Sequence, residues 1–135
     1  MEPISLYFHI PFCLRRCGYC DFNTFAGVTA LLPQYMHAMC QEMSYVLKQL
    51  PEGTQVHTVY FGGGTPSLVS TRQYRELFDI LRSSVNLLAD AEISLEANPG
   101  SVTDNYLQEL REIGFNRISF GMQSALEREL RILNR

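Results

Sequence analysis

The chain has 135 residues, so its length allows at most one domain. Eleven Lys and Arg against 14 Asp and Glu give a net charge of −3, which argues against a protein that binds nucleic acid through the phosphate backbone. Hydrophobic residues make up 46% and charged residues 19%, enough for a packed core and too apolar for a disordered chain. No apolar run approaches the roughly 18 residues of a membrane span, and the acidic start Met1-Glu2-Pro3 is not that of a signal peptide. We therefore expect a cytoplasmic protein with no membrane span and no nucleic-acid partner.

The first half of the chain predicts two strands on either side of one helix. Residues 5–10 alternate polar and apolar side chains and end at Pro11, which indicates a half-buried strand. Residues 33–50 carry apolar side chains three or four positions apart, which is typical of a helix. Residues 56–61 form a short apolar run that predicts a buried strand, and the glycine-rich turn 62–66 follows it.

The second half repeats the pattern of strand, loop and helix. Ser70 and Gln73 have the spacing of a capping box at the start of a second helix. Residues 91–96 alternate as a third strand, and residues 117–121 predict a fourth. A third helix and a last helix, the latter running to the end of the chain, are expected to follow their own capping residues: Thr103, and Ser124 with Glu127.

Four consecutive strand–helix units with short loops predict an α/β fold with a parallel sheet. Each strand has one apolar and one rather polar face, which fits a barrel with a site inside better than a flat sheet covered on both sides. A closed eight-unit barrel takes roughly 250 residues, so residues 1–135 supply about four units. We therefore expect the truncated N-terminal part of a single barrel domain, without linkers or internal repeats.

Three of the four cysteines lie within eight residues, in a loop directly after the first strand. They form the run Cys13-x3-Cys17-x2-Cys20, and three thiolates from one short loop can hold three corners of a cubane iron–sulfur cluster. The fourth iron then stays open for a substrate or cofactor. A structural zinc site, with His9 as the nearest fourth ligand, is the alternative, and a disulfide is less favoured in a reducing compartment. Cys40 lies in the apolar stripe of the first helix, which predicts a buried, inert thiol.

This cysteine spacing resembles the hallmark of the radical S-adenosylmethionine (SAM) superfamily. The surrounding residues narrow the resemblance to the oxygen-independent coproporphyrinogen III oxidase family, including its haem-chaperone branch, over almost the whole chain. Four segments carry it: Tyr7-Phe8-His9-Ile10-Pro11-Phe12-Cys13, Gly62-Gly63-Gly64-Thr65-Pro66-Ser67, Ser94-Leu95-Glu96-Ala97-Asn98-Pro99, and residues 114–123 with the sequence GFNRISFGMQ. The resemblance implies a partial (β/α)6 barrel that holds a [4Fe–4S] cluster through the three cysteines and binds SAM at the open iron.

The resemblance also implies which residues contact SAM. Most of them fall at the carboxyl ends of the predicted strands, where parallel α/β folds bind ligands. The implied contacts are Tyr7, Tyr19, Gly63, Gly64, Thr65, Glu96, Gln123 and Arg135.

Each of these positions has a plainer interpretation when it is taken alone. The glycines suit a tight turn without a ligand, and a single Glu such as Glu96 is most often a solvated charge. Arg135, at the end of the chain, is expected to be a frayed and unanchored residue. His9 fits a satisfied core histidine as well as a residue lining the site, while Arg15 and Arg16 either lie near the cluster's negative charge or are solvated.

Two departures from the oxidase pattern favour the haem-chaperone branch. The oxidases carry a further Cys two residues after the third, where this chain has Phe22, and they have a long N-terminal segment, whereas twelve residues precede Cys13 here. The resemblance implies SAM, haem or a porphyrinogen, and an electron donor as partners. An oxidase that decarboxylates the propionates of coproporphyrinogen III to vinyl groups is the alternative, and a zinc-bound structural module is the third possibility.

Overall fold

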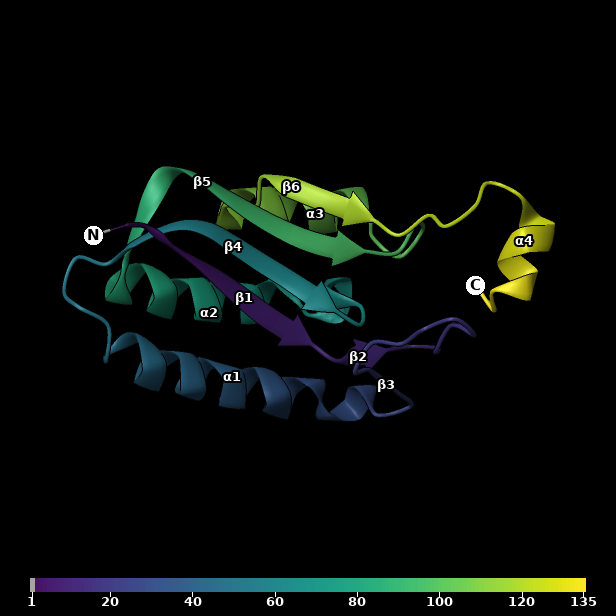
Figure 1. Ribbon diagram of the computed structural model, residues 1–135, viewed down its shortest axis with the longest axis horizontal. Helices are drawn as coiled ribbons and strands as arrows, with labels where there is room; N and C mark the ends of the chain where they lie inside the picture. Colours follow the sequence, from purple (N-terminus) through teal and green to yellow (C-terminus); the bar gives the residue numbers. More distant parts are fainter. Residues whose placement is uncertain (1) are drawn as a thin grey trace.

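Four parallel strands form the central sheet of the computed structural model, which describes residues 2–135 (Figure 1). Their spatial order is β1-β4-β5-β6, so each strand pairs with the strand of the next strand–helix unit along the chain. The strands span Ile4–Ile10, Gln55–Gly63, Asn86–Ala97 and Arg117–Phe120. The predicted parallel α/β sheet of four units is therefore confirmed.

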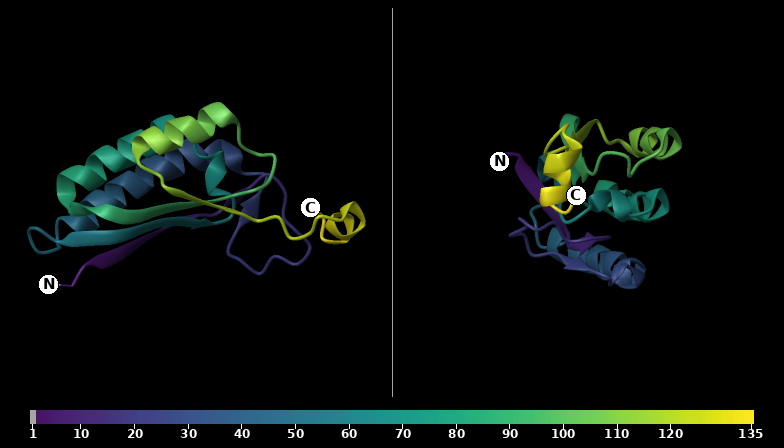
Figure 2. Two further views of the ribbon diagram at one scale, coloured as in Figure 1. Left: turned by 90° about the horizontal axis from the view of Figure 1, so that it is seen from above. Right: turned by 90° about the vertical axis from the view of Figure 1, so that its right-hand side faces the viewer.

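Three helices lie side by side on one face of this sheet and leave the other face open (Figure 2). They are α1 (Leu32–Leu47), α2 (Thr71–Ser84) and α3 (Asp104–Ile113). A sheet covered on one face alone is the arrangement of a barrel wall, in which helices form the outside and the other face of the sheet borders the interior. This agrees with the alternation of polar and apolar residues in the strands.

The predicted helix starts are confirmed at two of three places. The Ser70 hydroxyl accepts a hydrogen bond from the backbone N–H of Gln73, and the Gln73 side chain accepts one from the backbone N–H of Ser70, which completes a capping box. The Thr103 hydroxyl accepts from the backbone N–H of Tyr106 at the start of α3. Each cap satisfies an N–H that would otherwise lack a partner, which contributes about 1 kcal/mol.

The prediction for the last helix was wrong in two respects. Helix α4 spans Glu127–Ile132, follows Leu126 without a side-chain cap, and stops before the end of the chain. The Ser124 hydroxyl instead bonds the Glu129 carboxylate at 2.5 Å and the backbone N–H of Leu126 at 3.0 Å, so it shapes the turn before the helix. Asn134 has a φ of 56°, which ends the helical path.

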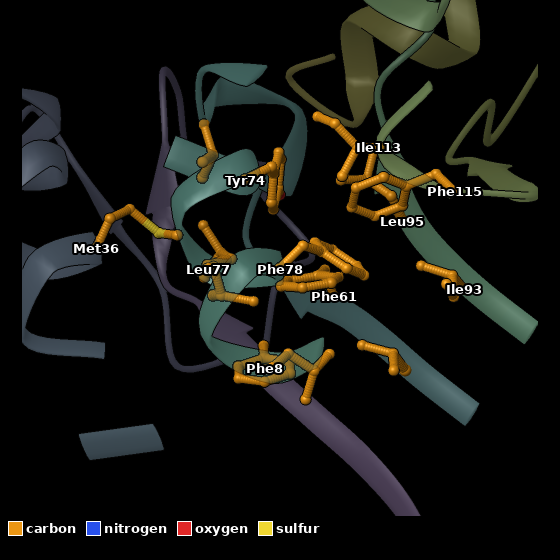
Figure 3. Close-up of a cluster of buried hydrophobic side chains, with 14 of the residues drawn as sticks. Phe8, Met36, Phe61, Tyr74, Leu77, Phe78, Ile93, Leu95, Ile113 and Phe115 are labelled. Atoms are coloured by element: carbon orange, nitrogen blue, oxygen red, sulfur yellow. The ribbon is translucent and has the colours of Figure 1, made fainter. Parts of the chain in front are cut away.

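The core lies between the sheet and the three helices and is centred on aromatic rings (Figure 3). Phe61 of β4 contacts Tyr74 of α2 edge to face, with ring centroids 5.0 Å apart, and Phe115 packs on both. Such pairs contribute about 0.5–1.5 kcal/mol each beyond the area they bury. The buried Tyr74 hydroxyl donates to the Pro66 carbonyl at 2.8 Å, which ties the turn after β4 to α2.

The cysteine loop leaves the sheet through a small element that the sequence did not predict. Strand β2 (Phe12–Cys13) pairs with β3 (Phe25–Ala26), and the short helices Thr29–Leu31 and Pro66–Leu68 flank this pair. Strand β5 also begins five residues earlier than expected. The two-stranded pairing closes the segment between Cys13 and Phe25 into a loop beside the carboxyl ends of the strands.

Cys40 is half-buried in α1, not fully buried as predicted. It packs against the edge of the core, and this partial burial raises the pKa of its thiol, helped by the nearby Glu76 carboxylate. A raised pKa keeps the thiol protonated and unreactive, so the prediction of an inert thiol agrees with the structure. Within residues 2–135, no helix combines the length and the apolarity that crossing a bilayer requires.

Candidate functional site

A cavity of about 160 Å³ lies at the carboxyl ends of β4, β5 and β6, between the cysteine loop and the end of the chain. Ten of the eleven site residues inferred from the sequence line it, and they come from segments far apart in the chain. They are Cys13, Cys17, Tyr19, Cys20, Gly63, Gly64, Thr65, Glu96, Gln123 and Arg135.

Tyr7 is the residue that the structure does not bring to the cavity wall. Its side chain is 59% exposed on the open face of β1, where its hydroxyl donates to His9 Nδ1 at 2.9 Å. His9 Nε2 in turn donates to the carbonyl of Asn23 at 2.9 Å. Both ring nitrogens of His9 are therefore engaged, which favours a satisfied histidine that holds the loop and leaves no nitrogen for a zinc ion.

The three loop cysteines are free thiols, and each contacts a hydrogen-bond donor. Thr65 Oγ1 lies 3.7 Å from Cys13 Sγ, and Arg135 Nη1 lies 3.2 Å from Cys17 Sγ. Cys20 Sγ and Thr24 Oγ1 are 3.7 Å apart. Donors of this kind stabilise the negative charge of a thiolate that binds metal.

The three loop cysteines lie around one cavity. In a cubane cluster each thiolate binds a different iron, so its ligands surround a volume rather than a point. The three thiolates therefore fit a [4Fe–4S] cluster, whereas a structural zinc site needs a fourth protein ligand and both ring nitrogens of His9 are engaged.

The glycine turn after β4 brings backbone into direct contact with the cysteine loop. Gly63 has a φ of +115°, and a Cβ there would lie 2.7 Å from the His9 ring. A Cβ on Gly64 would lie 2.6 Å from the Phe12 carbonyl oxygen and 3.0 Å from Cys13 Sγ. The turn is tight, as expected for glycines that serve a turn without a ligand, and it also lines the cavity. The close contacts of the turn require residues without side chains, and the same lack of side chains leaves the backbone open to the cavity.

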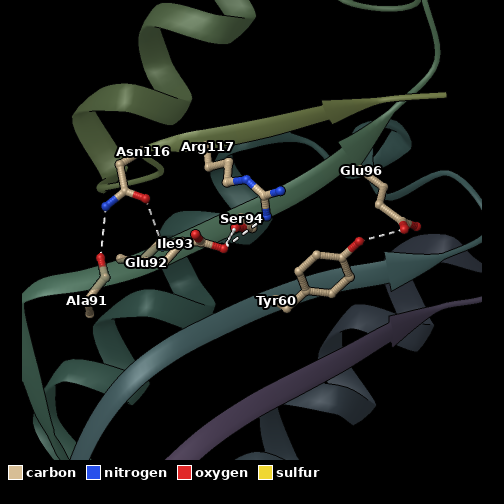
Figure 4. A network of polar contacts seen from close by, with 8 residues as sticks. All are labelled: Tyr60, Ala91, Glu92, Ile93, Ser94, Glu96, Asn116 and Arg117. Carbon is tan, nitrogen blue, oxygen red and sulfur yellow. Dashed lines mark hydrogen bonds and ion pairs between the residues drawn. The ribbon is translucent and has the colours of Figure 1, made fainter. Parts of the chain in front are cut away.

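Glu96 is a fixed carboxylate rather than a solvated one (Figure 4). Its Oε1 accepts a hydrogen bond from the Tyr60 hydroxyl at 2.6 Å, and its Oε2 accepts one from the backbone N–H of Gly63 at 3.1 Å. Desolvation and then this bond to Glu96 raise the pKa of Tyr60 to about 12, so the phenol is a neutral donor at physiological pH. The two donors aim the carboxylate at the end of β5 while leaving lone pairs for a cationic ligand.

A second polar group lies further back along the open face of the sheet. Ser94 donates to Glu92 at 2.6 Å and Arg117 forms an ion pair with the same carboxylate at 3.0 Å (Figure 4). These bonds lower the pKa of Glu92, the Ser94 bond most. The Asn116 side chain accepts a hydrogen bond from the backbone N–H of Ile93 and donates one to the carbonyl of Ala91, both in β5 (Figure 4). This group stabilises the pairing of β5 with β6 and does not line the cavity.

Gln123 lies in the segment after β6 with a φ of 63°, a conformation that costs a non-glycine residue free energy. Such positions concentrate at ligand sites, where the surrounding structure compensates the cost. Gln123 is among the residues that line the cavity.

Arg135 is anchored, so the expectation of a frayed terminal residue was wrong. Its guanidinium donates to Cys17 Sγ at 3.2 Å, to Asn98 Oδ1 at 2.6 Å and to the Gly121 carbonyl at 2.5 Å. The backbone N–H of Gly18 also donates to the Leu133 carbonyl at 3.1 Å. The end of the chain therefore lies against the cysteine loop, as the two views of Figure 2 also show.

Several lining residues were missed by the sequence analysis. They are small or polar, and each lies in the cysteine loop or at the carboxyl end of a strand: Thr24, Asn98, Ser119 and Gly121. Asn98 was named within the segment Ser94-Leu95-Glu96-Ala97-Asn98-Pro99 that carries the family resemblance, but no role was inferred for it. Its place one residue past the end of β5 was the available signal, because polar side chains at that edge face the ligand site. Of the two loop arginines, Arg15 lines the cavity and Arg16 donates to the Cys20 carbonyl at 3.4 Å.

Comparison with known proteins agrees with this arrangement. The model of the radical SAM superfamily matches residues 7–135. This chain belongs to the radical SAM superfamily. The resemblance inferred from the cysteine spacing and its surrounding motifs is therefore confirmed, and the fold is the one expected of a radical SAM protein.

Relatives of this radical SAM chain carry two names. The heme chaperone HemW of Mycobacterium tuberculosis strain H37Rv is 43% identical over 99% of this chain and 35% of its own length. HemW of Escherichia coli K12 is 40% identical over 100% of this chain and 36% of its own length. The solved structure of coproporphyrinogen III oxidase (HemN) from Escherichia coli, described as a radical SAM enzyme, superposes with a TM-score of 0.90 at 36% identity. It is matched over 98% of this chain and 31% of its own. The chain thus spans about a third of the length of these relatives.

Proposed function

We propose that this chain holds a [4Fe–4S] cluster through Cys13, Cys17 and Cys20 and binds SAM beside it. The observation that supports this most strongly is the gathering of three free thiols, the glycine turn and the fixed Glu96 around one cavity. When bound, such a cluster supplies the electron that cleaves SAM into methionine and a 5′-deoxyadenosyl radical.

The residues of the chain bind and orient the cofactor. The Glu96 carboxylate, held by two donors, accepts a hydrogen bond from a cationic amino group more readily than a mobile carboxylate, because its orientation is already fixed. The glycine turn lets a ligand approach the backbone of residues 63 and 64. Tyr19 places an aromatic ring at the rim of the cavity.

Within the superfamily, we propose a role like that of the haem chaperones. Phe22 stands where the oxidases carry a further cysteine, and its side chain is 66% exposed at the rim of the cavity. The HemW names of the relatives support the same branch. Haem or a porphyrinogen and a separate electron donor are then the expected partners, and the free thiols suit the reducing cytoplasm. Oxidation of coproporphyrinogen III is the second candidate, favoured by the superposition on HemN.

Anaerobic reconstitution with iron and sulfide tests the cluster. We expect a brown protein with about four irons and as many sulfides per chain, and we expect Cys17→Ala to lose most of this iron. A colourless protein that binds a single zinc ion and no sulfide would contradict the proposal. Haem titration and anaerobic turnover of coproporphyrinogen III by the same reconstituted protein separate the two branches: tight haem binding without turnover supports the chaperone, and turnover supports the oxidase.

A further inference from the structure

A continuous path of hydrogen bonds joins two of the three cysteine ligands. Asn98 Nδ2 donates to Thr65 Oγ1 at 3.3 Å, and the Thr65 hydroxyl donates to Cys13 Sγ at 3.7 Å. On the other side, Arg135 Nη2 donates to Asn98 Oδ1 at 2.6 Å, and Arg135 Nη1 donates to Cys17 Sγ at 3.2 Å. Asn98 is the central residue of this path, yet it touches neither sulfur.

The orientation of the Asn98 amide determines where both donors point. Its NH2 group occupies one lone pair of the Thr65 oxygen, which leaves the Thr65 proton free to point at Cys13. Its carbonyl oxygen takes one arm of the Arg135 fork and thereby directs the other arm to Cys17. A flipped amide would place its NH2 group against the guanidinium, where two donors would meet, so the partners fix one orientation.

We propose that Asn98 is a positioning residue for the cluster, which it serves by aiming one donor at Cys13 and another at Cys17. This inference rests on the proposed function, since it requires that the cysteines bind iron. Hydrogen bonds to cluster sulfurs stabilise the more negative, reduced state, and they are among the factors that set the reduction potential. Asn98 therefore keeps the potential higher than the three cysteines alone would give.

The third cysteine provides an internal contrast. Cys20 contacts Thr24, four residues along its own loop, and has no contact in the Asn98 path. The path instead connects the cysteine loop to three other parts of the chain: Thr65 after β4, Asn98 after β5, and Arg135 at the end of the chain. A change at Asn98 is thus expected to affect the bonding at two of the three ligated irons and to leave the third unchanged.

The test compares Asn98→Leu with wild type in the reconstituted chain. Leucine is close to asparagine in size and adds no charge, so it removes the hydrogen bonds without a new electrostatic effect. We expect a more negative midpoint potential in a redox titration followed by electron paramagnetic resonance. We also expect shifted iron–cysteine stretching bands in the resonance Raman spectrum. The matched control is Asn105→Leu on α3, where the asparagine bonds only Glu109, and it should leave both readouts at the wild-type values.

A second pair of variants keeps the test decisive if Asn98→Leu does not fold. Thr65→Val removes the hydroxyl that donates to Cys13, and Thr65→Ser keeps it, so only the valine variant should lower the potential. A merely structural role would lower the stability of these variants without moving the potential or the Raman bands. This inference alone would be overturned if wild type holds a cluster and Asn98→Leu leaves the potential and the Raman bands unchanged. If Asn98→Leu does not fold, the same unchanged result in Thr65→Val would overturn it. A wild-type chain that takes up no cluster would overturn the proposed function and this inference with it.

Discussion

The Tyr60 hydroxyl of β4 donates a 2.6 Å hydrogen bond to Oε1 of Glu96 at the end of β5. Tyr60 pairs with Ser94 in the sheet, so its ring extends along the open face toward the carboxylate two residues further on. The bond joins a residue that nothing in the sequence singled out to one that the family resemblance assigned to SAM binding. It explains why the carboxylate is fixed before any ligand arrives.

Replacing Tyr60 with Phe is expected to weaken SAM binding. The variant keeps the ring and its stacking on Tyr7 but removes the donor, so Glu96 retains only the Gly63 N–H. Bonds to charged groups are worth about 1.5–3 kcal/mol, and part of that loss should appear as an affinity about tenfold lower, or about 1.4 kcal/mol. Calorimetric titration of the reconstituted protein measures it. Tyr45→Phe, at an exposed position of α1, is the matched control, and an equal affinity in all three proteins would refute the role of Tyr60.

Desolvation of Tyr60, and then the same bond, make a small part of the folding stability depend on alkaline pH. The pKa of Tyr60 is about 12 in the folded protein against 10.0 for a free phenol, so the folded state holds this proton more tightly. The contribution is therefore complete below about pH 10 and is lost as the pH rises from about 10 to about 12. Urea denaturation at about pH 8 and about pH 11 measures the free energy of unfolding at each pH. This free energy should fall more between the two pH values for wild type than for Tyr60→Phe. An equal fall in both proteins would show that other groups account for the pH dependence.

The loop cysteines and Cys40 should respond differently to substitution. Single Ala variants of Cys13, Cys17 and Cys20 should each lose most of the iron, because each thiol lines the cavity. Cys40→Ala should keep the iron and lower the free energy of unfolding by about 1 kcal/mol, as expected for a small, half-buried side chain. Iron content and urea denaturation of the four variants check both statements. Loss of iron in Cys40→Ala as complete as in Cys17→Ala would refute the assignment.

Gly64→Ala should damage the cysteine loop through simple overlap. The added methyl group would lie 2.6 Å from the Phe12 carbonyl oxygen, which is backbone and cannot rotate away. We expect a loss of about 1–3 kcal/mol in stability together with a lower iron content. Gly53→Ala is the contrast, because Gly53 has a φ of +74° but no neighbour within 4 Å, so it tests backbone strain alone. It should lose some stability and keep its full iron content.

Local patterns in the sequence were sufficient to predict the four strand–helix units and most of the cavity lining. The capping pair Ser70 and Gln73 and the alternation of residues 91–96 depend on neighbours in the chain, so they could be recognised without the fold. The cysteine run and the triple glycine carry their chemistry in their spacing. The cavity brings these local motifs together because the carboxyl ends of parallel strands share one edge.

The errors arose where side-chain contacts that no local pattern specifies decide the structure. Arg135 was expected to be unanchored because a terminal residue has few local partners, yet Asn98, 37 residues away, holds it. Ser124 and Glu127 have the spacing of a capping box, but the Ser124 hydroxyl bonds the Glu129 carboxylate, so the box does not form. Tyr60 and Asn98 act through partners on other elements. Of the two, only Asn98 had a signal in the sequence, its place just past the end of a strand.

The central claim is that three thiolates hold the cluster and leave one iron open to SAM. Electron paramagnetic resonance of the reduced, reconstituted chain with and without SAM tests this most directly, since direct binding of SAM to an iron alters the environment of the unpaired electron. We predict a cluster signal whose shape changes when SAM is added and stays unchanged when the same concentration of adenosine is added instead. A cluster signal that SAM leaves unaltered would contradict the claim.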